Sequence, residues 1–266
     1  MWCACAIRVG PSSVHQVRAH ARASCSCAVN VQFALHELPH VLTCTRPTAG
    51  GEVPIVPYIV RPGAPLGTDL RAALGIPRNA TVFGRHGGFT TFDVPYVPPA
   101  ICEYAKAHPQ VYFVMMNTPR ICAPGDTPPN VHHLPPTSSD ERKSRFIRTC
   151  DAMIHARKFG ETFGLAVAEF SVHNKPVITC SVVLDPRNPF VAGPDRMHLD
   201  VLSNRALLYH DKASFTLQLD QFDRYDARRR DWNAYRAYAP DTVMATFARV
   251  FLNGSQCRTN AKSTGK

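Results

Sequence analysis

The sequence lacks the features that define several classes of protein. It has no run of 18 apolar residues, so we expect no segment to span a bilayer as a helix. The Cys-x-Cys pairs lack the two-residue spacing usual in zinc sites, and we expect neither a metal nor another cofactor. The ten cysteines do not form a disulfide framework, because five lie in the first 44 residues and the others are widely separated. Cys150 and Cys180 are expected to be buried thiols of a soluble, cytoplasmic protein.

Acidic residues are absent from residues 1–36, which contain Arg8, Arg18 and Arg22 with several Ser and Ala. This composition has some similarity to an organelle transit segment, but we favour a poorly ordered or non-native leader. The first 67 residues show no sustained periodicity and end in a linker at 61–67 with two prolines and two glycines. We therefore expect an irregular N-terminal region over 1–67, the remnant of a domain, and a disordered tail over 254–266.

Positive charge exceeds negative charge, with a formal net charge of +10 and a pI near 9.3. This balance suits nucleic acid, an anionic membrane surface or a phosphorylated small ligand. The densest basic cluster, 228–230, lies beside Asp226 and Asp231, as is typical of a solvated helix face. No aromatic residues interleave with basic ones to form a stacking platform, so we expect no nucleic-acid partner.

Apolar strands alternate with helical segments from residue 68 to residue 253. The expected strands are 80–85, 111–116, 131–134, 152–156, 176–180 and 206–209, and the expected helices are 69–75, 100–107, 140–150 (capped by Ser139), 163–172, 214–222 and 241–252. This rhythm is typical of βαβ units, which build a parallel sheet with helices on both faces. The fold class is therefore α/β, with a doubly wound, Rossmann-like parallel sheet in one domain at 68–253.

The first candidate site segment is the glycine-rich turn that follows the first of these strands. Gly84, Gly87 and Gly88 would let the main chain approach a ligand, and Arg85 could place its forked guanidinium on phosphate oxygens. A simple tight turn explains the same glycines, so this signal is weak alone. In a parallel α/β sheet, however, ligands bind beyond the carboxyl ends of the strands, where this turn lies.

The second candidate segment, 158–169, follows the strand at 152–156 and opens a helix. Glu161 and Glu169 are eight residues apart, and eight residues of helix rise about 12 Å, comparable to the separation of sugar and ribose in a sugar nucleotide. The backbone N–H groups near Phe163 and Gly164 would face the diphosphate, with Lys158 as a neutralising cation. A solvated helix charge is the alternative interpretation of Glu169, but its apolar neighbours make an idle carboxylate costly there.

The stretch Glu161-Thr-Phe-Gly-Leu-Ala-Val-Ala-Glu169, followed by Asn174-Lys-Pro-Val-Ile178, resembles a known signature. It is similar to the Glu-x7-Glu motif and following strand of the retaining group 1 (family 4) glycosyltransferases, which act in carbohydrate biosynthesis and have two facing Rossmann-like domains (GT-B). The resemblance covers about residues 75–252. It implies that Glu161 contacts the donor sugar, that Glu169 contacts the ribose, and that a basic pair grips the diphosphate.

That family commonly has a lysine about five residues after the arginine of the first turn, where this chain has Thr90 or Thr91. We infer that Lys158 supplies the missing charge beside Arg85. Main-chain groups at 134–137, beginning with Leu134, are expected to line the base, and His155 is either a donor contact or a core histidine.

These observations predict the donor half of a metal-independent retaining glycosyltransferase, which moves a hexose-type sugar from a UDP- or GDP-sugar to an unknown acceptor. The predicted catalytic residues are Glu161, Arg85 and Lys158, and the predicted donor-binding residues are Gly84, Gly87, Gly88, Leu134, Phe163, Gly164, Leu165 and Glu169. A separate chain could supply the complementing N-terminal domain. The alternatives are an inactive nucleotide-sugar-binding module or fragment, a nucleotide-sugar epimerase of related architecture and, last, a basic nucleic-acid binder.

Overall fold

The computed structural model describes residues 55–63, 67–185, 187–193 and 195–249, with backbone only at 55 and 188–191. It also describes the backbone of β1 (Gln16–Arg18), β2 (Ala28–Gln32) and β3 (Val41–Cys44). The chain divides into two units, and the larger extends from Val60 to Arg236. This division lies near, but not at, the boundaries expected at 67 and 253. The tail predicted at 254–266 lies outside the described residues, as does the leader predicted within 1–36 except for the backbone of β1 and β2.

The smaller unit contains an antiparallel sheet in the order β1-β2-β3-β4, where β4 is Ile55–Val56. Its helix α7 (Pro240–Phe247) contacts β4 and begins with a proline, whose missing N–H has no partner to lose in the first turn of a helix. The expected helix at 241–252 therefore exists in its first half, and its last residues lie outside the described part of the chain.

The larger unit contains a six-stranded sheet, and every strand pair in it is parallel. Its strands are β5 (Thr81–Arg85), β6 (Val111–Met116), β7 (Val131–Leu134), β8 (Ala152–His155), β9 (Val177–Cys180) and β12 (Ala206–Tyr209). The spatial order is β12-β9-β8-β5-β6-β7. This arrangement confirms the predicted doubly wound α/β fold and the positions of all six expected strands.

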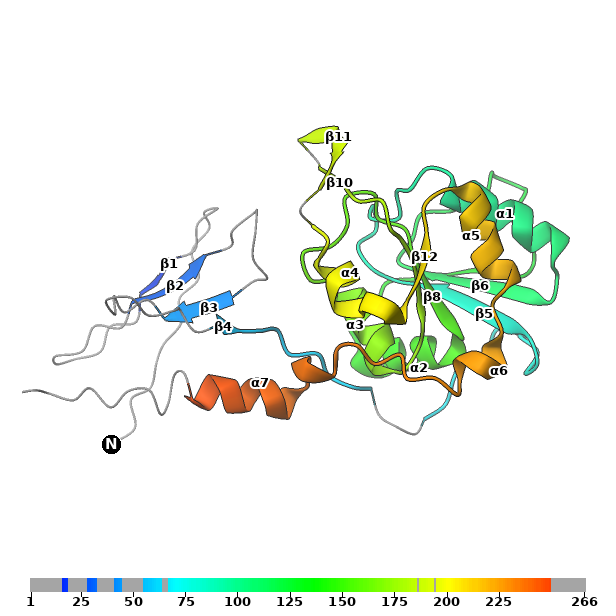
Figure 1. The fold of residues 1–266 in the computed structure, drawn as a ribbon. Helices are drawn as coiled ribbons and strands as arrows, with labels where there is room; N and C mark the ends of the chain where they lie inside the picture. The colour runs from blue at the N-terminus through cyan, green and yellow to red at the C-terminus, as the bar shows by residue number, and fades with distance from the viewer. Residues whose placement is uncertain are drawn as a thin grey trace, which may run out of the picture. The chain divides into compact units, whose positions relative to one another are not determined.

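Helices cover both faces of this sheet (Figure 1), with α1 (Val97–Ala107) and α5 (Lys212–Asp220) on one face and α2 (Asp140–Thr149) and α3 (Leu165–Val172) on the other. Alternate strand residues such as Phe83, Phe113 and Ile154 join α1 and α5 in one buried cluster. Side chains of successive strand residues point to opposite faces, so the intervening residues pack on α2 and α3. The core thus forms two apolar layers with the sheet between them.

Helix α2 begins where the sequence predicts it. The Ser139 side chain accepts a hydrogen bond from the Arg142 backbone N–H, and Asp140 and Glu141 occupy the first turn. Both features stabilise a helix N-terminus, the first by satisfying a free donor and the second by complementing the helix dipole. Because α2 follows β7, its first turn lies at the carboxyl edge of the sheet.

Gly84 has a packing role in strand β5. A β-carbon there would lie 2.2 Å from Sγ of Cys150 and 3.2 Å from the Phe146 ring, so only glycine lets the end of α2 pack this closely. The side of Gly84 on which a β-carbon would lie is therefore filled by α2, and its contribution to a donor site stays a prediction.

Some elements differ from the expectation. Residues 69–75 form a single turn, in which the Leu74 N–H donates to the Leu70 carbonyl, because Gly75 stops the segment before a helix can extend. The hairpin of β10 (Leu184–Asp185) and β11 (Asn188–Ala192) and the short helices α4 (Met197–Leu202) and α6 (Arg224–Ala227) were not predicted. Two 3₁₀ turns, Ser203–Arg205 and Arg236–Tyr238, complete the described elements.

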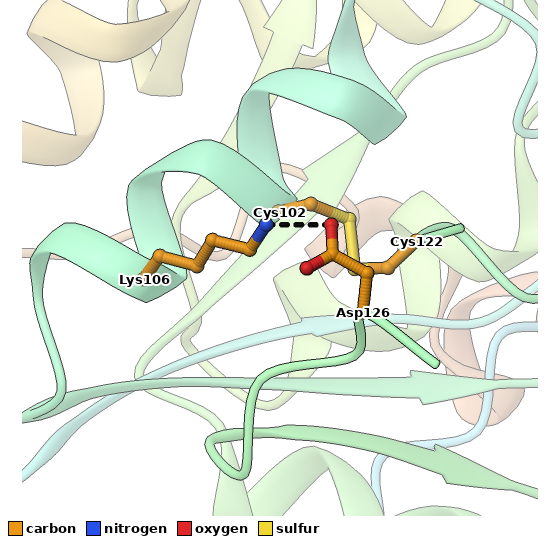
Figure 2. Close-up of a disulfide and its surroundings, with 4 residues drawn as sticks. All are labelled: Cys102, Lys106, Cys122 and Asp126. Carbon is orange, nitrogen blue, oxygen red and sulfur yellow. Dashed lines mark hydrogen bonds and ion pairs between the residues drawn. A yellow bond between two sulfur atoms is a disulfide. The ribbon is translucent and has the colours of Figure 1, made fainter. Parts of the chain in front are cut away.

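Two of the cysteines are paired, which corrects the expectation from their spacing. A disulfide joins Cys102 on α1 to Cys122 in the loop after β6, and Lys106 contacts Asp126 at 2.5 Å beside it (Figure 2). The expectation failed because the fold places this loop against α1, although 20 residues separate the two cysteines. Cys150 and Cys180 are buried free thiols, as predicted.

Among the residues described, no helix has the length and apolar character needed to cross a membrane.

Candidate nucleotide-sugar site

The order of the strands marks one point at the carboxyl edge of the sheet. From β5 the chain proceeds to β6 and β7 on one side, and then crosses back to β8, β9 and β12 on the other. The loops that leave β5 and β8 therefore diverge, and ligands of open α/β sheets bind in the crevice that such a reversal opens. Arg85 ends β5 and His155 ends β8, so both predicted segments lie at this point.

Glu161 is held by two basic side chains in the loop after β8. Arg157 Nη1 lies 2.5 Å from its Oε2, and His155 Nε2 lies 3.4 Å from its Oε1. Burial raises the pKa of the Glu161 carboxyl, whereas the hydrogen bonds and charges of His155 and Arg157 lower it. The lowering effects together are larger, so the pKa is below its usual value. Glu161 is therefore a fixed carboxylate at neutral pH, oriented by its partners.

Glu169 has a similar pair of partners from other elements. Lys143 of α2 bonds its Oε1, and His86 Nε2 lies 3.1 Å from its Oε2. Burial raises the pKa of Glu169 despite the lowering by Lys143, whereas burial and the charge of Lys143 lower the pKa of His86 to about 3. Each carboxylate thus lies beside one cation and one buried histidine, and the two histidines come from the ends of adjacent strands.

Helix α3 begins at Leu165, after Gly164 with a φ of 77°. Of the residues from Glu161 to Glu169, only 165–169 are helical. The distance calculated for a continuous helix between the two carboxylates is therefore wrong for the first half of this stretch. The left-handed conformation at Gly164, which side chains disfavour, turns the chain into the helix there. Phe163 is buried and its carbonyl accepts a hydrogen bond from the Tyr235 hydroxyl at 2.8 Å, whereas Leu165 is exposed.

The Arg85 guanidinium is 2% exposed and binds the protein itself. Nη1 donates to the Asn117 carbonyl and the Thr118 hydroxyl, both at 2.8 Å, and Nη2 donates to the Gly88 carbonyl at 2.7 Å and the Thr91 hydroxyl at 2.9 Å. Burial lowers its pKa to about 10, which still leaves it charged at neutral pH. Arg85 therefore fixes the turn after β5 to the end of β6.

Asn117 contacts the turn after β5 but was not predicted from the sequence to do so. Its φ is 48° and its side-chain amide donates to the Gly87 carbonyl at 2.8 Å, while Gly87 has a φ of 149°. Backbone strain in a non-glycine residue is concentrated at functional sites. The only sequence signal was an asparagine directly after an apolar strand, a residue type that tolerates the left-handed conformation.

Lys158 lies in the loop after β8, where its backbone N–H donates to Asp93 Oδ1 at 2.9 Å and its carbonyl accepts from Leu184 N at 2.9 Å. Its amine is 4.7 Å from the centre of the Phe159 ring and makes no hydrogen bond with the residues that the structure describes. Asp93 thus joins the loops after β5 and β8. The Leu134 carbonyl, predicted to line the base, accepts a hydrogen bond from the Asn117 N–H at 3.1 Å.

The described side chains include no group of three or more His, Cys, Asp or Glu placed to hold a metal ion.

The solved structures that resemble this chain share one class of fold. No protein-family model and no curated protein sequence matches the chain. Solved structures do: a UDP-forming α,α-trehalose-phosphate synthase from Burkholderia xenovorans matches with a TM-score of 0.53 and 11% identity over 76% of this chain and 55% of that one. A glycosyltransferase from Rickettsia africae matches with a TM-score of 0.51 and 12% identity over 74% of this chain and 57% of that one.

Alr3699/HepE from Anabaena, solved with UDP and glucose, aligns at a TM-score of 0.48 and 15% identity over 68% of this chain. The chain spans 50% of HepE, about half of its length. The unit from Val60 to Arg236 therefore has the Rossmann-like fold found in GT-B glycosyltransferases, and at these identities the likeness defines the fold.

Proposed function

We propose that the crevice at the ends of β5 and β8 binds a UDP- or GDP-sugar, and that the chain supplies the donor half of a metal-independent retaining glycosyltransferase. The observation that carries the proposal is the pair Glu161 and Glu169, on either side of the start of α3, each paired with a cation and lying beside a buried histidine. The fold shared with an enzyme described as UDP-forming supports it.

Glu161 is the group that would hold the sugar hydroxyls, because its lowered pKa keeps it an acceptor of hydrogen bonds at neutral pH. Glu169, beside Lys143, would hold the ribose hydroxyls. The backbone N–H groups at the start of α3 carry the positive end of the helix dipole and suit the diphosphate between them. Lys158 would add a further positive charge. It is the one cation of this loop whose amine makes no hydrogen bond with a described side chain.

Retention of configuration would follow from attack on the face from which the nucleotide leaves, with the departing diphosphate accepting the proton of the acceptor hydroxyl. The protein then needs no nucleophile, and its task is to stabilise the charge that develops on the leaving group. Lys158 and the start of α3 would do this directly. Arg85 would contribute its buried charge and the position of the turn that it holds.

A donor-binding module without transfer is the second candidate. The chain spans about half of the length of the solved proteins it resembles, so donor binding and transfer to an acceptor are separate proposals. An epimerase, the third candidate, would need the same donor crevice but no acceptor.

Calorimetric titration with UDP-glucose, GDP-glucose and the free diphosphates tests the binding proposal, and release of the diphosphate from the same donors tests turnover. We expect micromolar to millimolar binding of one donor, weakened at least tenfold by Glu161→Ala. Glu103→Ala, which removes an exposed carboxylate paired with Lys212 on the helical face, is the matched control and should bind as the wild type does. Binding without turnover would favour the module, and absence of binding to every donor would reject both.

A further inference from the structure

A buried chain of three side chains leads from Glu161 into the protein. His155 at the end of β8 lies with Nδ1 2.9 Å from the Thr179 hydroxyl of β9, and that hydroxyl lies 3.4 Å from Nε2 of His198 on α4. The three residues are between 0% and 6% exposed. A buried polar chain of this kind is costly unless its members bond one another, so its presence beneath a site carboxylate calls for a role.

The ionised state of Glu161 sets the direction of every hydrogen bond in the chain. A carboxylate only accepts, so the proton of a singly protonated His155 is on Nε2, which faces Glu161 Oε1. Nδ1 is then an acceptor and the Thr179 hydroxyl donates to it. The Thr179 oxygen in turn accepts from Nε2–H of His198, whose pKa burial and the neighbouring His155 lower to about 2, so that this ring is neutral.

The far end of the chain also touches the start of α3. A β-carbon on Gly164 would be 3.3 Å from Cβ of His198, and the rings of His155 and His198 have their centroids 4.9 Å apart. His198 therefore packs beneath the turn from Glu161 to Gly164 and also orders the hydrogen bonds that reach the Glu161 carboxylate. Both connections fix Glu161 relative to the helix start.

We propose that Thr179 and His198 are positioning residues for the donor sugar, acting through His155 on the carboxylate of Glu161. The inference rests on the proposed function, because it takes Glu161 as the contact of the sugar. Loss of the Thr179 hydroxyl should weaken the binding of the sugar part of the donor and leave the nucleotide part unaffected, since the hydrogen bonds of Thr179 reach neither Glu169 nor the start of α3.

The test compares Thr179→Val, which removes only the hydroxyl, with Thr179→Ser, which retains it. Calorimetry is run with the matching pair of UDP-glucose and UDP, or GDP-glucose and GDP. Thr179→Val should weaken the sugar nucleotide by about tenfold, as expected for one lost hydrogen bond with a charged neighbour, and should leave the free diphosphate within twofold. Thr179→Ser should restore the sugar nucleotide affinity, and His198→Phe should weaken the sugar nucleotide at least as much as Thr179→Val does.

Thr216→Val on α5, where the hydroxyl bonds only the Lys212 carbonyl, is the matched control and should change neither affinity. Equal binding of the sugar nucleotide by Thr179→Val and the wild type would overturn the proposal, as would an equal loss for the free diphosphate. ¹⁵N NMR of the histidine rings gives a readout without any ligand: His155 should carry its proton on Nε2 in the wild type, and the Nδ1 resonance should shift in Thr179→Val, where Nδ1 has lost its hydrogen-bond donor. If the wild type binds no donor, the proposed function fails, while the NMR result still decides whether the chain orders His155.

Discussion

Gly160 lies against the backbone carbonyl of Asp195, so closely that a β-carbon on Gly160 would be 2.0 Å from that oxygen. The φ of Gly160 is 71°. The loop that carries Glu161 is thus fixed to the segment before α4 by a contact that no side chain could occupy. The base of the hairpin from Leu184 to Ala192 adds to this contact, because Leu184 N donates to the Lys158 carbonyl.

Replacement of Gly160 by alanine should therefore be strongly destabilising. The left-handed backbone alone costs alanine about 1–2 kcal/mol, and the clash with Asp195 must be relieved by movement of the loop. We expect a loss of about 3 kcal/mol in the free energy of unfolding and weaker donor binding. Gly75→Ala is the control, since Gly75 has a φ of 65° and no atom within 4 Å of its added carbon. Equal losses in the two variants would show that the contact has no energetic weight.

The Cys102–Cys122 disulfide should stabilise the larger unit. Closing a loop with a sequence separation of 20 lowers the entropy of the unfolded chain by an amount worth about 3 kcal/mol. The double variant Cys102→Ser with Cys122→Ser should lose about this much in denaturant unfolding, and reductant should have the same effect on the wild type but none on the variant. Lys106→Ala removes only the exposed ion pair beside the disulfide and should change stability by less than about 1 kcal/mol.

Arg85 and Lys158 should differ in kind when they are replaced. Arg85→Met removes four hydrogen bonds made by a buried guanidinium and should reduce the free energy of unfolding by about 3 kcal/mol or more, as well as donor affinity. Lys158→Ala should reduce donor affinity at unchanged stability. Arg142→Met, on the exposed side of α2, controls for the substitution itself. Full stability of Arg85→Met would contradict the role given to its four bonds.

Stability should fall as the pH is lowered from about 6.5 toward 4. Burial lowers the pKa of His86 to about 3 and that of His198 to about 2. Below about pH 6.5 these two histidines therefore bind protons in the unfolded chain but not in the folded protein. The unfolded state then binds more protons, and the free energy of unfolding decreases by about 1.4 kcal/mol per pH unit for each such histidine. His198→Gln should reduce this slope by about one proton in urea titrations at several pH values. His210→Gln, at an exposed position, should leave the slope unchanged.

The sequence predicted what depends on local pattern. The period of the apolar residues located the six strands, and Ser139 with its following acidic residues located the start of α2 to the residue. The two candidate segments could be chosen because strand ends and glycine turns are visible along the chain, and they lie at the ends of β5 and β8. The retaining mechanism, the donor and the role of each site residue stay predictions.

What failed depends on contacts between distant segments. Two of the four hydrogen bonds of Arg85 reach Asn117 and Thr118, more than 30 residues away, and nothing in the sequence near Arg85 indicates them. The disulfide likewise joins positions that only the packing of α1 on the loop after β6 brings together. The partners of Glu161 and Glu169 come from β8 and the loop after it, from the turn after β5 and from α2, so the sequence indicated the carboxylates and His155 but not the pairing of Glu169 with His86 and Lys143.

The packing of Gly84 on Cys150 has a consequence for sequence variation. A β-carbon at position 84 would lie 2.2 Å from Sγ of Cys150 and 3.1 Å from its Cβ, so the two positions share a single small volume. A larger residue at 84 can be accommodated only if position 150 shrinks to glycine or the end of α2 moves away. Among homologous chains the two positions should therefore covary, and a pair of large residues at 84 and 150 should not occur.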